Sequence, residues 1–179
     1  MVLFYCLWVV KLEGNSGTLD VGCGHSPKGD VNVDLFIEAT SHRSYDQSKC
    51  DDVRLDVKKI PNFVRADAQF LPFRDNSFEE VSSNHVIEHV DAPLRMLKEM
   101  LRVSNNSIVI RCPHRFSSHK KKTLHIHSFN LTWFFNVFSK FGLTHECQYV
   151  GWRYIPHIYF TIIRLPSEIE VKAYKRKFR

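Results

Sequence analysis

The stretch Leu19-Asp20-Val21-Gly22-Cys23-Gly24 decides the fold of this chain. It predicts a short strand, residues 17–21, that runs into a tight glycine turn, where glycine allows a close backbone approach that a Cβ would prevent. A second short strand, residues 31–34, ends in the carboxylate of Asp34. A carboxylate in this place can accept both hydroxyls of a ribose, so the stretch predicts a nucleoside site at the carboxyl edge of a parallel sheet. By itself, a pair of glycines is equally typical of an ordinary turn.

The spacing between these two strands narrows the choice of ligand. In dinucleotide-binding folds the glycine turn opens a helix whose N-terminus carries the pyrophosphate. Here only residues 25–30 separate Gly24 from the second strand, which is too short for that helix. We therefore expect a ligand with a ribose and no pyrophosphate, which argues against NAD and FAD.

Two segments in the middle of the chain carry a family resemblance. The first is Asp67-Ala68-Gln69-Phe70-Leu71-Pro72-Phe73-Arg74-Asp75-Asn76-Ser77-Phe78-Glu79-Glu80-Val81, and the second is Asn84-His85-Val86-Ile87-Glu88-His89-Val90. With the glycine stretch and Asn32-Val33-Asp34, they resemble class I S-adenosylmethionine-dependent methyltransferases of the type 11 group over residues 18–103. The resemblance rests on the combination, because no single piece is specific.

The resemblance implies an α/β, Rossmann-like class I methyltransferase fold. Such a fold has a mainly parallel seven-stranded sheet with an antiparallel last strand and helices on both faces. In this chain the first helix after the glycine loop should be reduced or missing, and Ser26 stands where many members have a third glycine. We expect one domain, residues 1–179, with a cofactor-binding half (18–103), a basic half (104–179) and an acceptor-side loop (113–130).

The resemblance also implies S-adenosylmethionine as the cofactor and assigns roles to single residues. Asp34 would hold the ribose hydroxyls, and Asp67 would accept a hydrogen bond from the adenine amino group, although it could instead cap a turn before Leu71. The candidate cofactor-binding residues are Asp20, Gly22, Cys23, Gly24, Asp34, Asp67, Ala68, Asn84 and His85. The candidate catalytic residues are His85 and His114, as general bases for an acceptor that is a poor nucleophile when protonated.

Hydrophobic patterning predicts the remaining elements. Further strands are expected at residues 62–66, 80–83 and 107–111, with a terminal two-strand pair at 148–154 and 157–165. Two helices are expected, one with Asp91 as N-cap that runs to Val103 and one over residues 131–141. Residues 36–52 predict an irregular excursion or short helix, and residues 53–57 a short strand or turn.

Composition is consistent with an ordinary globular protein of 179 residues, with 44% hydrophobic and 25% charged residues. Its five cysteines are scattered without a C-x-x-C pair, which favours a reducing compartment, and we expect a cytoplasmic location. Residues 1–10 are apolar but too few to span a bilayer, so we expect no membrane association and predict that they pack against the sheet.

Charge divides the chain into two halves. Residues 1–100 contain 11 Lys and Arg against 16 Asp and Glu, whereas residues 101–179 contain 14 against 3. The basic half could attract RNA or another anion, and aromatic residues such as Trp133 and Tyr174 could stack on bases. The alternative interpretation is a solvated basic tail with its aromatic residues in the core.

Histidines cluster between the predicted fifth strand and the last helix, at His114, His119, His125 and His127. Their spacing fits no zinc motif, so no metal site is predicted. His125 and His127 could instead line the acceptor. The pair Glu88-His89 could act as a general acid and base, but we favour the interpretation that it places an acid at a helix N-terminus, where an acid stabilises the free amides.

These observations leave two classes of function open. The leading hypothesis is methyl transfer from S-adenosylmethionine to a small molecule or an RNA. The alternative is a non-catalytic methyltransferase-fold subunit that acts through a protein partner, which the short glycine loop favours and the three carboxylates Asp20, Asp34 and Asp67 disfavour. A nicotinamide oxidoreductase is excluded by the missing phosphate-binding helix.

Overall fold

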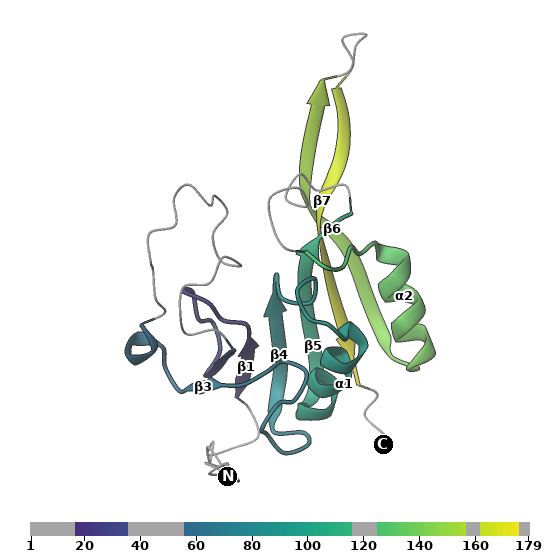
Figure 1. Cartoon of the computed structure of the whole chain (residues 1–179). Coiled ribbons are helices and arrows are strands. Elements are labelled where there is room, and N and C mark those ends of the chain that lie inside the picture. Colours follow the sequence, from purple (N-terminus) through teal and green to yellow (C-terminus); the bar gives the residue numbers. More distant parts are fainter. Residues whose placement is uncertain (1–16, 36–55, 116–124, 157–161, 176–179) are drawn as a thin grey trace.

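A computed structural model describes residues 17–35, 56–115, 125–156 and 162–175 of the chain (Figure 1). The expectations for residues 1–10, 36–52 and 53–55, and for His119, lie outside the described residues. The elements in chain order are β1 (Thr18–Val21), β2 (Val31–Asp34), the 3-10 helix η2 (Val57–Lys59), β3 (Phe63–Arg65), β4 (Phe78–Asn84), α1 (Pro93–Val103), β5 (Ser104–Pro113), α2 (Leu131–Lys140), β6 (Thr144–Pro156) and β7 (Ile162–Tyr174).

The strands form one seven-stranded sheet in the order β3-β2-β1-β4-β5-β7-β6. Strands β1 to β5 pair in parallel, and β7 pairs antiparallel with both β5 and β6. The predicted mainly parallel sheet with an antiparallel last strand is therefore confirmed. In Figure 1 the paired strands β6 and β7 extend well beyond the ends of the other strands.

No helix lies between β1 and β2, as the short spacing predicted. The connection reverses at Gly29, where a Cβ would lie 2.5 Å from the Val31 carbonyl oxygen. The buried side chain of Asn32 fixes this reversal: it accepts the Gly29 N–H at 3.0 Å and donates to the carbonyl oxygens of Gly29 and Pro61 at 2.9 and 2.8 Å. A tight turn thus replaces the helix that usually joins parallel strands.

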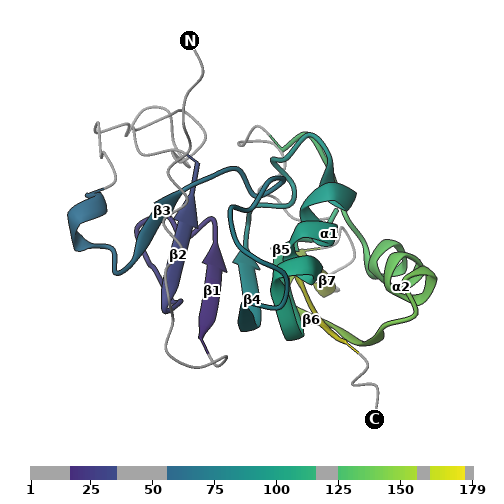
Figure 2. The same ribbon diagram turned by 90° about the horizontal axis from the view of Figure 1, so that it is seen from below.

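One face of the sheet is apolar and carries the core. Residues that pair directly across neighbouring strands share a face, and on this face Leu19, Val81, Ile108 and Ala173 form one row across β1, β4, β5 and β7. Both described α-helices pack here (Figure 2). Their fully buried side chains are Met96, Leu97, Met100 and Val103 from α1 and Phe134 and Phe138 from α2.

The opposite face is polar over the central and last strands. Lys172 donates to Glu80 at 2.8 Å, and Arg111 pairs with Glu170. These residues alternate with the apolar ones, so the strands do not have the continuous hydrophobic runs of a parallel sheet that is covered on both faces. The helices expected on the second face are not among the described residues.

The terminal strand pair is longer than predicted. β6 begins at Thr144 and β7 continues to Tyr174, with Cys147 opposite Val171 and Thr144 opposite Tyr174. Of the predicted second strand, 157–165, residues 157–161 lie outside the described residues, and its end was placed too early because the alternation of Ile169, Val171 and Ala173 with charged residues was not taken as a strand signal. Lys172, one of the basic residues of the second half of the chain, therefore lies inside the sheet.

The start of α1 also differs from the prediction. The helix begins at Pro93 with Ala92 as N-cap, and the Ala92 N–H donates to the side chain of Gln69 at 2.9 Å. Asp91 is therefore not the cap, and Glu88 and His89 lie in a turn that precedes the helix. None of the described helices is long and apolar enough to cross a membrane.

Candidate functional site

A cavity of about 650 Å³ opens at the carboxyl ends of β1, β2 and β4. The strand order reverses between β1 and β4, which is where open α/β sheets bind ligands. The first part of the chain contributes Val21, Gly22, Gly24, His25, Val33, Asp34, Leu35, Ala66, Asp67, Ala68 and Gln69 to the wall. Later segments contribute His85, Val86, Glu88, His89, Val90, Asp91, Pro113, His125 and Glu168.

Two glycines form the floor of this cavity at the end of β1. Gly22 has a φ of +78°, its N–H donates to the Val33 carbonyl at 2.7 Å, and a Cβ there would lie 2.1 Å from Val86 Cγ2. Gly24 has a φ of +53°, and a Cβ there would meet nothing within 4 Å. Packing therefore requires the first glycine, whereas the second leaves open space at the cavity wall.

Two of the predicted carboxylates line the cavity. Asp34 is 7% exposed, and its Oδ2 accepts the Gly24 N–H at 3.0 Å, which ties the end of β2 to the glycine loop. Asp67 Oδ1 accepts the Gln69 N–H at 2.8 Å. Asp67 thus caps a turn, as one of its two interpretations expected, and it also lines the cavity, while its contact with adenine stays a prediction.

Asp20 lies behind the cavity wall. Its side chain is buried, its Oδ2 accepts the Lys28 N–H at 3.0 Å, and burial raises the pKa of its carboxyl. The carboxylate therefore holds the chain that follows the glycine loop.

The end of β4 brings His85 into the cavity. Its φ is +56°, an uncommon conformation for a residue other than glycine, and its N–H donates to the Arg111 carbonyl at 2.9 Å. His85 Nδ1 lies 3.3 Å from Glu88 Oε1, and this interaction raises the pKa of the imidazole against the opposing effect of burial. Asn84, by contrast, is exposed and does not line the cavity.

Two further predicted residues lie outside the cavity wall. Cys23 packs in a small apolar cluster with Ile60. His114 is 4% exposed, and its ring packs edge-on against Tyr149 at 5.4 Å between centroids. Among the candidate bases, the geometry therefore favours His85.

The cavity wall also contains two carboxylates, Glu88 and Glu168, that were not among the candidate cofactor-binding or catalytic residues. Glu88 is 1% exposed, and neither of its carboxylate oxygens has a partner in hydrogen-bond geometry among the described residues. Glu168, from β7, also lines the cavity and lies 3.8 Å from His85 Nε2. The pair Glu88-His89 was a signal for this position, whereas nothing in the local sequence pointed to Glu168.

Comparison with protein families identifies the class of the fold. The sequence profile of a methyltransferase domain family matches residues 19–108. The chain therefore belongs to this family of class I S-adenosylmethionine-dependent methyltransferases. A comparison with curated protein sequences finds no significant match.

Solved structures with the same fold share little sequence with the chain. One is an S-adenosylmethionine-dependent methyltransferase from Thermotoga maritima, a possible histamine N-methyltransferase, with a TM-score of 0.60, 16% identity, and 95% of this chain and 87% of that chain covered. Another is a putative methyltransferase in a complex with a methyltransferase activator from Haloferax volcanii, with a TM-score of 0.56, 13% identity, and coverages of 94% and 86%. At these identities the likeness concerns the fold.

Proposed function

We propose that this protein binds S-adenosylmethionine in the cavity and transfers its methyl group to an acceptor, either a small molecule or an RNA. The observation that carries the proposal is the position of Asp34 and Asp67 on one wall of a cavity at the strand-order switch, with Gly22 and Gly24 as its floor. A volume of about 650 Å³ is within the range of small-molecule sites.

The orientation of the cofactor follows from the family and from this wall. In this orientation Asp34 would hold the ribose hydroxyls, and the segment from Asp67 to Gln69 would contact the adenine ring. The methionine end and its sulfonium would then extend toward the glycine loop and the end of β4. That arrangement would direct the methyl group toward the wall formed by His85, Glu88 and His125.

The chemistry requires little from the protein beyond alignment. A lone pair of the acceptor attacks the methyl carbon, the carbon–sulfur bond breaks, and its electron pair stays on sulfur to give S-adenosylhomocysteine. Holding acceptor, methyl and sulfur in line supplies most of the acceleration. Where the acceptor is a hydroxyl, its proton must also leave, and His85 is the candidate base because it lines the cavity.

Calorimetric titration with S-adenosylhomocysteine tests the proposal, with NAD as the control ligand. We expect saturable binding of S-adenosylhomocysteine alone. Asp34→Ala should weaken it by about 2 kcal/mol, roughly 30-fold, because a hydrogen bond to a charged group contributes this much.

The matched control is Asp56→Ala, because Asp56 is exposed and lies outside the cavity wall. Its affinity for S-adenosylhomocysteine should equal that of the wild type. Unchanged affinity in Asp34→Ala would remove Asp34 from the site, and no binding by the wild type would refute the proposal.

The alternative function, a non-catalytic subunit, would need a surface for a protein partner. Glu80, Arg111 and Lys172 give the sheet a polar face opposite the described core, and a partner could contact that face. Co-purification of a stoichiometric protein partner together with absence of S-adenosylhomocysteine binding would favour this alternative.

A further inference from the structure

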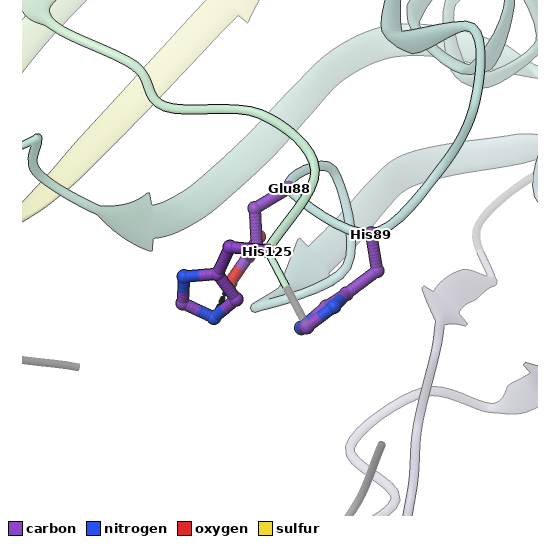
Figure 3. A group of neighbouring side chains, drawn as sticks. All are labelled: Glu88, His89 and His125. Carbon is purple, nitrogen blue, oxygen red and sulfur yellow. Dashed lines mark ion pairs between the residues drawn. The ribbon is translucent and has the colours of Figure 1, made fainter. Parts of the chain in front are cut away.

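Three potential metal ligands converge on the acceptor-side wall of the cavity (Figure 3). They are the Glu88 carboxylate and the imidazoles of His89 and His125, and one ligand atom of each lies within 4.8 Å of the other two. Glu88 and His89 come from the turn after β4, and His125 comes from the segment before α2. All three line the cavity.

Backbone contacts fix this convergence independently of the side chains. The N–H groups of Ile126 and His127 both donate to the Glu88 carbonyl, at 3.0 and 3.2 Å. His125 is thereby held beside Glu88, with its Nε2 3.9 Å from Glu88 Oε1 and its ring 4.8 Å from that of His89. The group is therefore formed by the fold itself, because His125 is distant in sequence from Glu88 and His89.

The second observation is that the Glu88 carboxylate is buried without hydrogen bonds to other described residues. A buried carboxylate normally accepts several hydrogen bonds, because its desolvation is costly. Glu88 has no partner in hydrogen-bond geometry within the described part of the chain, although His85 and His125 are near its Oε1. A divalent cation between the carboxylate and the two imidazoles would supply the missing interaction.

We propose that Glu88, His89 and His125 form a binding site for a divalent transition-metal ion whose open coordination position faces the cavity. Two imidazoles and one carboxylate are the donor set of sites that hold Zn²⁺ or Fe²⁺ and keep a position for water or substrate. Zn²⁺ bonds of about 2.0–2.2 Å require the ligand atoms to move inward by about 1 Å. The spacing of the loop histidines did not reveal this set, since two of its members come from the turn after β4.

The role of the metal, unlike its binding, rests on the proposed function. The open position faces the space in which the methyl group would be presented. A hydroxyl bound there would lose its proton more readily, because a divalent metal lowers the pKa of a coordinated oxygen. The acceptor would therefore belong to the class of molecules with an oxygen that can coordinate a metal.

The test uses the full chain, freed of metal by EDTA and dialysis and titrated with Zn²⁺ in a calorimeter. We expect one ion per chain, and Glu88→Gln, His89→Gln and His125→Gln should each weaken binding at least about 10-fold, the loss that even outer-shell changes cause. The matched control is His127→Gln: this histidine is two residues from His125 and contacts the Asp91 carbonyl at 3.4 Å. It should bind Zn²⁺ like the wild type.

A second readout does not depend on heat or activity. Co²⁺ in such a site should give visible absorption bands in the wild type and in His127→Gln, which His125→Gln should lose while keeping its circular dichroism spectrum. Absence of stoichiometric Zn²⁺ binding by the wild type would overturn the inference. Binding that all three ligand variants retain would mean an adventitious ion only and would overturn it as well. S-adenosylhomocysteine titration of Glu88→Gln separates the two proposals, because loss of the metal should leave cofactor binding within a few-fold.

Discussion

At Gly22 the chain combines a φ of +78° with a backbone packed against the side chain of Val86. We predict that Gly22→Ala lowers the free energy of unfolding by about 3 kcal/mol, from the left-handed backbone and from overpacking. Gly24→Ala should lower it by about 1 kcal/mol only, because its Cβ would enter open space. Urea denaturation of both variants measures the difference, and equal losses would contradict the packing argument.

The sequence predicted these glycines and Asp34 as site residues, but not the reasons for each. The clash that makes Gly22 necessary involves Val86, which is distant in sequence and was not singled out. Asn32 was quoted only as part of a strand, yet its side chain bonds to Gly29 and Pro61 and holds the turn that replaces a helix. Such roles depend on contacts between segments, which a sequence pattern does not contain.

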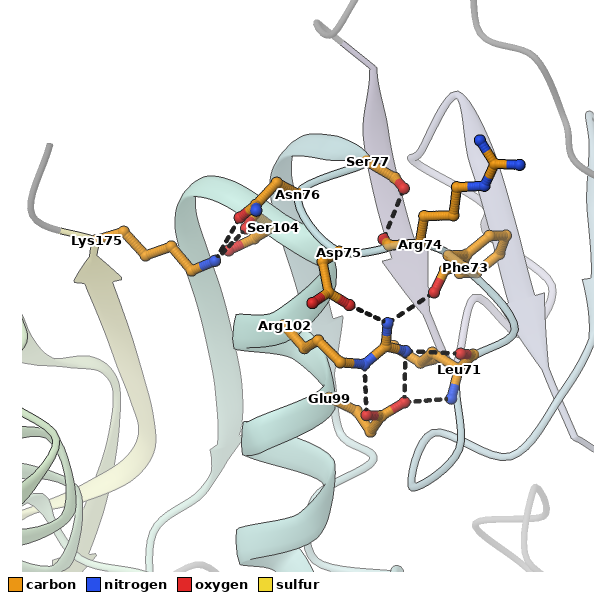
Figure 4. Close-up of polar contacts among 10 residues, drawn as sticks. All are labelled: Leu71, Phe73, Arg74, Asp75, Asn76, Ser77, Glu99, Arg102, Ser104 and Lys175. Carbon is orange, nitrogen blue, oxygen red and sulfur yellow. Dashed lines mark hydrogen bonds and ion pairs between the residues drawn. The ribbon is translucent and has the colours of Figure 1, made fainter.

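At the scale of elements, a cluster of polar contacts joins α1 to the segment that follows the cavity wall (Figure 4). Arg102 donates to the carbonyl oxygens of Leu71 and Phe73, at 2.9 and 2.7 Å, and to Asp75 at 2.8 Å. Glu99 pairs with Arg102 and accepts the Leu71 N–H at 2.8 Å. The Leu71-Pro72-Phe73 motif is thus held by the helix, and it positions the adjacent residues Asp67 to Gln69.

This cluster should make stability depend on pH. The hydrogen bonds that Glu99 accepts from Arg102 lower the pKa of the Glu99 carboxyl below its usual value of about 4.5. A lowered carboxyl pKa contributes stability that is fully present above the unfolded-state pKa and is lost as the pH falls through the folded-state pKa. We predict that Glu99→Gln lowers the free energy of unfolding by about 1–2 kcal/mol at pH 7. This deficit relative to the wild type should shrink as the pH falls from about 6 to 3.

Chemical denaturation across this pH range measures the deficit. Glu79→Gln is the control, because Glu79 is an exposed residue of β4 outside the cluster. A deficit in Glu99→Gln that stays constant down to pH 3 would contradict the assigned pKa direction.

The existence of the elements was easier to predict than their ends. Strand β2 was placed correctly because its alternation is bounded by Asp30 and by the carboxylate that ends it. The start of α1 was misplaced because Gln69, from another segment, satisfies the Ala92 N–H that a local cap would have satisfied. The end of β7 was missed because Glu170 and Lys172 suggest solvent, whereas they pair with Arg111 and Glu80 on the polar face.

At the scale of the whole molecule, the positive charge of the second half is partly compensated within the sheet. Arg111 and Lys172 form ion pairs, and Lys175 donates to Asn76 Oδ1 and the Ser104 carbonyl at 2.8 and 2.6 Å. These three side chains belong to the basic half, residues 104–179, for which the sequence left RNA binding and a solvated tail as alternatives. The contacts of Arg111 and Lys172 place them on the polar face of the sheet, whereas Lys175 lies beside the C-terminal end of α1. None of the three lines the cavity.

The cavity joins segments from most of the sheet, so ligand binding should stabilise the whole fold. Its wall is built from the ends of β1, β2 and β4 and from residues of β5 and β7. A ligand that binds only the folded state at about 100 times its Kd adds roughly 2.7 kcal/mol. For a chain of 179 residues this corresponds to a rise in Tm of roughly 5–10 °C.

We predict this rise with S-adenosylhomocysteine and none with NAD, as measured by differential scanning calorimetry. Asp34→Ala should lose most of the shift at the same ligand concentration, while Asp56→Ala should keep it. A shift of equal size in Asp34→Ala would place the ligand elsewhere on the molecule. The wild type could also show no shift at a concentration of S-adenosylhomocysteine that saturates other members of the fold. That result would favour the non-catalytic subunit, because a ligand raises the Tm only when it binds the folded state.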